Sequence, residues 1–258
     1  MGRGRLSRLG AVAANTFRET VRERILYNLV FFAILMTFSG LLVGQLSIRQ
    51  DEKIIKDIGL ASMELFGTLI AIFIGVGLVS KEIERRSLYP LLAKPLAREE
   101  LYLGKFLGLA FTLLVNVGLM TIGLFLTLLA TGRPADPQLL KAVYAIYLGL
   151  LLVVALALLF SSVTSSALAS VFTVGVVVGG RYSDVIKNMR EVAPGAPEWL
   201  LQLLYWALPN FRNFDFKDRA AYGDPVSAAA LGWVTSYAAA YVVLVLVLGL
   251  LSFRARDF

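Results

Sequence analysis

Residues 80–105 have the sequence SKEIERRSLYPLLAKPLAREELYLGK, a charged stretch between two apolar runs of membrane-spanning length. Its basic residues indicate the cytoplasmic side, because Lys and Arg are enriched in cytoplasmic loops. Pro90 and Pro95 bracket about one helical turn that presents leucine side chains. The basic residues are Lys81, Arg85, Arg86, Lys94, Arg98 and Lys105, and the leucines are Leu88, Leu91 and Leu92. The stretch predicts a docking surface; the alternative is an interfacial piece whose leucines enter the lipid headgroups.

The composition indicates a polytopic membrane protein. Of the 258 residues, 58% are hydrophobic and only 17% are charged, whereas soluble proteins carry about 25% charged residues. The net charge of +7 comes from basic residues in short loops beside apolar runs, so we interpret it as a topology signal and predict no nucleic-acid partner. The chain has no Cys and no His, which excludes thiolate chemistry, disulfides, and thiol or imidazole metal sites.

The hydropathy pattern predicts an all-α chain with six transmembrane helices, at residues 25–46, 60–80, 104–131, 143–160, 163–180 and 226–253. An amphipathic helix over 1–24 is predicted to lie on the inner membrane surface, because apolar residues recur there at helical spacing between arginines. Residues 81–103 form a cytoplasmic loop, and residues 181–225 form outer re-entrant or interfacial helices. The turn SSVTSS at 161–166 is so short that the spans on either side must form an antiparallel hairpin. An even number of spans places both termini on the same side of the membrane, and the Arg and Lys residues near the two ends predict that this side is the cytoplasm.

Polar and aromatic residues inside the predicted spans are candidates for a substrate path. Glu64 lies near the outer end of its predicted span, where a carboxylate is either functional or in contact with interfacial water. Asn116 is also explained by an interhelical hydrogen bond. Trp233, Tyr237 and Tyr241 fall at four-residue spacing and so share one helix face, which would line a path for an amphipathic substrate or simply pack.

Glycine pairs at four-residue spacing permit close contact between helices. Three such pairs occur in or beside the predicted spans: Gly40 with Gly44, Gly104 with Gly108, and Gly175 with Gly179. Each pair is a candidate helix interface.

Three stretches together resemble the type-2 ABC exporter permeases. They are NTFRETVRERILY at 15–27, KEIERRSLYPLLAKPLAREELYLGKFLG at 81–108, and YWALPNFRNFD at 205–215. The resemblance covers nearly the whole chain. It is closest to the branch that contains the permeases of sodium extrusion and of copper-site maturation for nitrous oxide reductase.

The resemblance implies a membrane half of a pump whose ATP-binding subunit is a separate polypeptide. In that family the loop after the second span holds a coupling helix that fits a groove on the ATPase. Carried over to this chain, the coupling role falls on Glu82, Glu84, Arg85, Arg86, Leu88, Pro90, Leu91, Leu92 and Pro95. ATP and Mg²⁺ would bind to the partner, with no catalytic residue, metal site or cofactor in this chain. A second permease copy and membrane lipids would surround it in the cell membrane of a bacterium or archaeon.

The sequence agrees with ATP binding by a separate subunit. Gly104 and Lys105 lack the upstream glycine and the following Ser or Thr of a phosphate-binding loop. Two other classes stay open. A nucleotide-independent secondary transporter or channel would need ionisable residues near the middle of several spans, and a lipid-acting membrane enzyme would need convergent catalytic groups.

Overall fold

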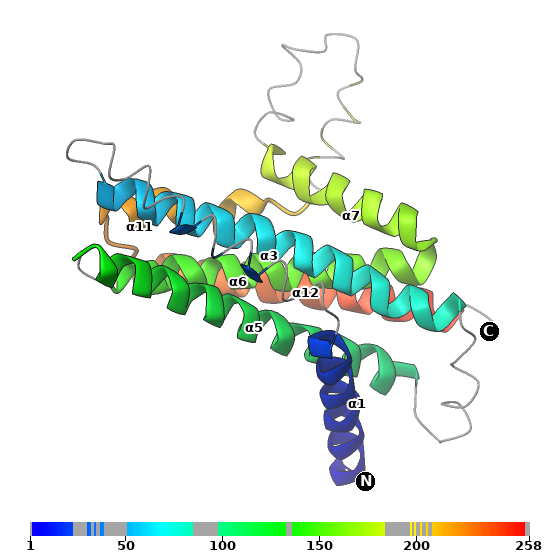
Figure 1. The fold of residues 1–258 in the computed structure, drawn as a ribbon. Coiled ribbons are helices and arrows are strands. Elements are labelled where there is room, and N and C mark those ends of the chain that lie inside the picture. The colour runs from blue at the N-terminus through cyan, green and yellow to red at the C-terminus, as the bar shows by residue number, and fades with distance from the viewer. Residues whose placement is uncertain are drawn as a thin grey trace.

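The described part of the chain is a bundle of long helices (Figure 1). The computed structural model describes residues 2–22, 30–31, 34, 37–38, 51–84, 98–132, 136–183, 197, 199, 202, 205 and 208–255. Its elements are α1 (Gly2–Arg22), α3 (Asp51–Glu84), α5 (Arg98–Ala130), α6 (Gln138–Val163), α7 (Ser166–Arg181), η1 (Phe211–Phe214), α11 (Lys217–Tyr222) and α12 (Ala228–Ala255). No strand occurs among these residues, which confirms the predicted all-α fold.

Four of the described helices are long and apolar enough to cross a membrane. Their spanning segments are Glu52–Gly77, Glu99–Ala130, Gln138–Val163 and Ala228–Phe253. Helix α7 has 16 residues and is about 24 Å long, so it is shorter than a typical span. The predicted first span at 25–46 lies largely outside the described residues. The multi-pass membrane class is therefore confirmed, and the number of six spans stays a prediction.

Helix α3 begins earlier than its hydropathy predicts. The predicted span starts at residue 60, but α3 starts at Asp51 and includes charged residues that the sequence analysis left in a loop. Glu52 lies in the first turn, where an acid favours the positive end of the helix dipole, and Lys56 Nζ lies 2.5 Å from Glu52 Oε1 one turn away. Glu64 is therefore about 20 Å along the helix axis from Asp51, and its position near the outer end of the membrane span stays a prediction.

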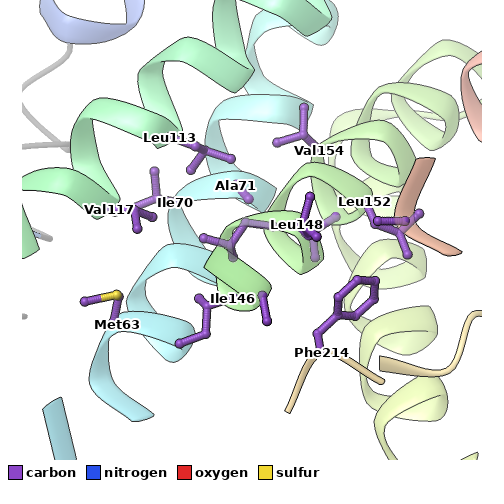
Figure 2. Packing of buried hydrophobic residues seen from close by; sticks show 14 of the residues in the cluster. Met63, Ile70, Ala71, Leu113, Val117, Ile146, Leu148, Leu152, Val154 and Phe214 are labelled. Atoms are coloured by element: carbon purple, nitrogen blue, oxygen red, sulfur yellow. The ribbon is translucent and has the colours of Figure 1, made fainter. Parts of the chain in front are cut away.

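Helix α6 lies at the centre of the bundle. It is apolar on every face, as expected of a helix that other helices surround, and most of its residues are buried. Figure 2 shows its Ile146, Leu148, Leu152 and Val154 among side chains of α3 and α5, with Phe214 of η1 beside them.

The contact between α3 and α6 depends on small residues. A Cβ added to Gly75 would lie 2.7 Å from the Cβ of Ala157, and one added to Gly67 would lie 2.7 Å from Leu150 Cδ1. Ala71 lies between these glycines at four-residue spacing and is buried. Small residues at this spacing let helices approach closely in a membrane.

Helices α6 and α7 form the predicted hairpin. Helix α6 ends at Val163 and α7 begins at Ser166, so only Thr164 and Ser165 separate them. The Thr164 amide donates a last helical hydrogen bond to the Phe160 carbonyl at 2.9 Å, and the extended backbone of Thr164 then ends α6. The predicted hairpin is confirmed.

The amphipathic helix α1 packs against protein as well as facing outward. Figure 1 shows α1 running across α5 near the beginning of α5. A Cβ on Gly104 would lie 2.7 Å from Val12 Cβ, and one on Gly108 would lie 2.6 Å from Thr16 Cβ. The predicted interface at these two glycines is therefore confirmed, with α1 as the partner.

The other two glycine pairs have different outcomes. Gly40 and Gly44 lie outside the described residues. Gly175 has no atom of the described residues within 4 Å of an added Cβ, so the prediction of a helix interface at Gly175 with Gly179 is wrong within this part of the chain.

The segment after α7 returns to the bundle. Helix α11 packs against α3 and α6, and η1 packs against α6 and α7. Phe211, Phe214 and Phe216 are buried in these contacts. Gly223 ends α11 with a φ of +76°, a left-handed conformation that glycine adopts without steric cost.

Candidate functional site

The predicted coupling segment connects two neighbouring helices at one end of the bundle. Helix α3 ends at Glu84 and α5 begins at Arg98. Figure 1 shows both of these ends on the same side as the α6–α7 turn and the C-terminal end of α12. Glu82 and Glu84 lie in the last turn of α3. The other predicted coupling residues, Arg85, Arg86, Leu88, Pro90, Leu91, Leu92 and Pro95, lie outside the described residues.

The first turns of α5 are firmly packed where the coupling segment ends. Glu99 and Glu100 occupy the first turn, as the sequence predicts, and favour the positive end of the helix dipole. Arg8 Nη2 of α1 lies 3.4 Å from Glu100 Oε1, and the Glu100 side chain is only 6% exposed. The segment 85–97 is thus attached to a helix that α1 holds in place.

Glu64 belongs to a cluster of four charged side chains, which we call the Glu64 cluster. It contains Glu64 of α3, Arg181 at the end of α7, and Asp215 and Lys217 of the segment that leads into α11. The two terminal nitrogens of the Arg181 guanidinium donate to Glu64, Nη1 to Oε1 and Nη2 to Oε2 at 3.0 Å, and Lys217 Nζ donates to Glu64 Oε2. Asp215 lies 3.6 Å from Arg181 and 3.7 Å from Lys217.

The charges of the Glu64 cluster balance. Two carboxylates and two cations share the site, and Lys217 and Glu64 are mostly buried, with side chains 12% and 20% exposed. Buried charges are tolerated when each has a partner of opposite sign and hydrogen bonds. Glu64 is therefore held by two cations and joins α3 to α7 and to the segment that leads into α11. In this conformation Glu64 connects elements of the bundle. It could bind a substrate only after Lys217 or Arg181 had moved away from it.

Glu64 was a candidate from the sequence alone, but its three partners were not. Arg181 follows Glu64 by 117 positions and Lys217 follows it by 153, so no local pattern relates them. The signal available was compositional, because acids and bases balance within 181–225. That balance is consistent with ion pairs between these residues and their neighbours.

The aromatic residues of α12 do not act as one surface. Tyr237 and Tyr241 have ring centroids 4.7 Å apart, and Tyr237 lies 5.9 Å from Phe214 of η1. The Asn210 amide donates to Tyr237 Oη at 2.7 Å. Trp233 is 67% exposed. Tyr237 therefore packs against Tyr241 and against η1, while Trp233 is largely exposed.

Asn116 is almost completely buried in α5, with 1% of its surface exposed. Neither amide atom has a hydrogen-bond partner among the described residues. The interhelical hydrogen bond suggested by the sequence is not formed within this part of the chain.

Comparison with known families identifies the class of protein. A family model described as ABC-2 family transporter protein matches residues 10–258. The chain therefore belongs to the ABC-2 transporter family and is a permease subunit of an ABC transporter, the transport rather than the catalytic part of such a machine. A search of curated proteins finds no match.

Proposed function

We propose that this permease subunit couples ATP hydrolysis by a separate ATP-binding subunit to export of a substrate across the membrane. The observation that carries the proposal is the family match over residues 10–258. The coupling contact would be formed by the segment 85–97 together with Glu82 and Glu84. ATP and Mg²⁺ would bind to the partner subunit.

The position of the segment supports this role. It connects α3 with α5, two helices that form part of the buried core, so a force on 85–97 acts directly on spanning helices. Basic residues at Lys81, Arg85 and Arg86 favour a cytoplasmic location, where an ATP-binding subunit would be found. Both termini would then also be cytoplasmic, in a bacterial or archaeal cell membrane.

The leucines at the centre of the segment have enough apolar surface for docking. Each fully buried leucine contributes roughly 1.5–3 kcal/mol, so Leu88, Leu91 and Leu92 together would contribute several kcal/mol. The ATPase biases the permease only by the difference between its contacts in two states. A few kcal/mol is sufficient to shift a two-state equilibrium by more than tenfold.

A second permease copy would complete the translocation path. Helix α12 leaves a broad apolar face uncovered, which includes Val243, Leu244, Val247, Leu248 and Leu251, each 46–59% exposed. Lipid and a second copy of this chain are both suitable neighbours for such a face. We propose that two copies pair and that lipids cover the remaining apolar surface.

Charge reversal in the coupling segment tests the proposal. The variant carries Arg85→Glu, Arg86→Glu and Leu91→Asp, and the measurement is copurification of the ATP-binding subunit from native membranes. We expect copurification and permease-dependent ATP hydrolysis to be lost. The control is Asp224→Lys, an exposed charge reversal in the outer segment, which should leave both unchanged.

Two results would contradict the proposal, one in its functional class and one in its docking assignment. If the unmodified chain brings down no ATP-binding subunit, a secondary transporter, a channel or a lipid-acting enzyme becomes the better explanation. If the triple variant retains its ATPase, the docking assignment is wrong.

A further inference from the structure

Within its first turns, helix α5 contacts two helices that are distant from it in the sequence. On one face, Gly104 and Gly108 receive α1. On another face, Tyr102 contacts the C-terminal part of α12. Most of the contact surface of α12 is instead with α6, so the contact of α5 with α12 is short.

Tyr102 lies directly on the backbone of α12 at Gly249. A Cβ added to Gly249 would be 1.9 Å from Tyr102 Oη and 2.7 Å from Cζ, so only glycine leaves room for the ring. The ring of Phe253, one turn further along α12, has its centroid 5.9 Å from that of Tyr102. Tyr102 is 1% exposed, so the ring is enclosed by these neighbours. An enclosed ring transmits displacement because well-packed interiors hardly compress.

The Tyr102 hydroxyl is a second indication that the contact with α12 has a role beyond packing. Within the described part of the chain, Tyr102 Oη has no hydrogen-bond partner. Buried hydroxyl groups normally have one, since leaving the group unpaired costs free energy. Phenylalanine would fill the same volume without that cost, so the hydroxyl is unexplained by packing in this conformation.

We propose that Tyr102 is the positioning residue that transmits movement of the coupling segment to α12. The inference rests on the proposed ATP-driven function. Displacement of the segment 85–97 moves the first turns of α5, which begin at Arg98. The Tyr102 ring then displaces α12 at Gly249, and α12 moves relative to α6. The hydroxyl acquires its hydrogen-bond partner in the second state.

Spin labels on the cysteine-free chain measure this transmission. One pair, Val163→Cys with Leu107→Cys, reports movement of α5 relative to the end of α6. The other pair, Val163→Cys with Leu251→Cys, reports movement of α12 relative to the same reference. All three positions are 49–54% exposed. The distances are compared with and without a non-hydrolysable ATP analogue, in complexes purified with the ATP-binding subunit and reconstituted in lipid nanodiscs.

We expect both distances to change with nucleotide in the otherwise native chain. In Tyr102→Ala, the α5 distance should still change and the α12 distance should stay constant. In Tyr102→Phe, the ring is retained, so the α12 distance should again change, but the nucleotide-bound population should fall because the hydroxyl lacks its new partner. Gly232→Ala is the control on α12, since an added Cβ there has no described atom within 4 Å.

The spin-label distances distinguish an error in the proposed ATP coupling from an error in the role of Tyr102. If neither distance responds to nucleotide in the native chain, the proposed ATP coupling is wrong. If both distances still respond in Tyr102→Ala, coupling stands and the role of Tyr102 is overturned. Reduced stability of Tyr102→Ala alone does not imitate the expected result, because a variant that assembles and moves α5 has folded.

Discussion

Neutralising Glu64 should lower the free energy of unfolding. The size of the loss follows from the burial of its partners in the Glu64 cluster and their distances from it. Glu64→Gln keeps the size and shape of the side chain and changes the charge of the cluster from zero to +1. Lys217, with a side chain 12% exposed, loses its closest carboxylate. Removing one partner of a buried pair costs about 3–5 kcal/mol. Arg181 is 36% exposed, so its share is at most about 1 kcal/mol.

Asp215 reduces the total. It already lies 3.6 Å from Arg181 and 3.7 Å from Lys217 and can move closer to either cation. We therefore expect a loss of about 2–4 kcal/mol in the free energy of unfolding. The assay is unfolding in mixed micelles with increasing sodium dodecyl sulfate, followed by tryptophan fluorescence and by circular dichroism.

A double-mutant cycle separates the ion pair from other effects of the substitution. Glu64→Gln with Lys217→Met should lose less than the sum of the two single variants, with a coupling energy of about 1–3 kcal/mol. The control is Asp218→Asn, an exposed acid on α11, which should change stability by less than about 0.5 kcal/mol. A loss below about 0.5 kcal/mol for Glu64→Gln would refute the view that this cluster joins α3 to α7 and the outer segment.

Two further predictions concern packing and topology. Gly75→Ala should be less stable than Gly77→Ala by about 1–3 kcal/mol in the same micelle assay, because both gain the same helix propensity but only Gly75 faces Ala157 at 2.7 Å. Adding Ala157→Gly should restore Gly75→Ala, and equal stability of the two glycine variants would contradict the close α3–α6 contact. Single cysteines at Thr164 and Asp224 should be labelled by an impermeant maleimide from opposite sides of the membrane, with Asp224→Cys reached from outside. Labelling of both from one side would invalidate the proposed topology.

Hydropathy alone predicted the helices whose apolar runs are long and uninterrupted. Helices α6 and α12 include the predicted ranges 143–160 and 226–253 almost entirely, since a continuous apolar run permits few alternatives. The same criterion places the beginning of the second span at residue 60, whereas α3 begins at Asp51, because five of the seven residues 51–57 are charged and hydropathy does not report ion pairs within a helix.

Contacts between distant elements were harder to predict than the elements themselves. The apolar periodicity of α1 predicted an amphipathic helix, but it did not distinguish lipid from α5 as the surface that this face covers. The stripe of Gly67, Ala71 and Gly75 has the spacing of a helix interface, and so could have been recognised. Tyr102 gave no such signal, because its importance arises from Gly249 on a helix that follows much later in the chain.

Site-specific cross-linking at Leu91 tests the docking of the coupling segment most directly. The chain contains no cysteine, so Leu91→Cys with a photoactivatable reagent gives a single reactive position. In native membranes, we expect a covalent product with the ATP-binding subunit, whose yield changes when ATP is added. Labelling of the same position by an impermeant reagent from outside, or cross-linking to lipid alone, would contradict the account.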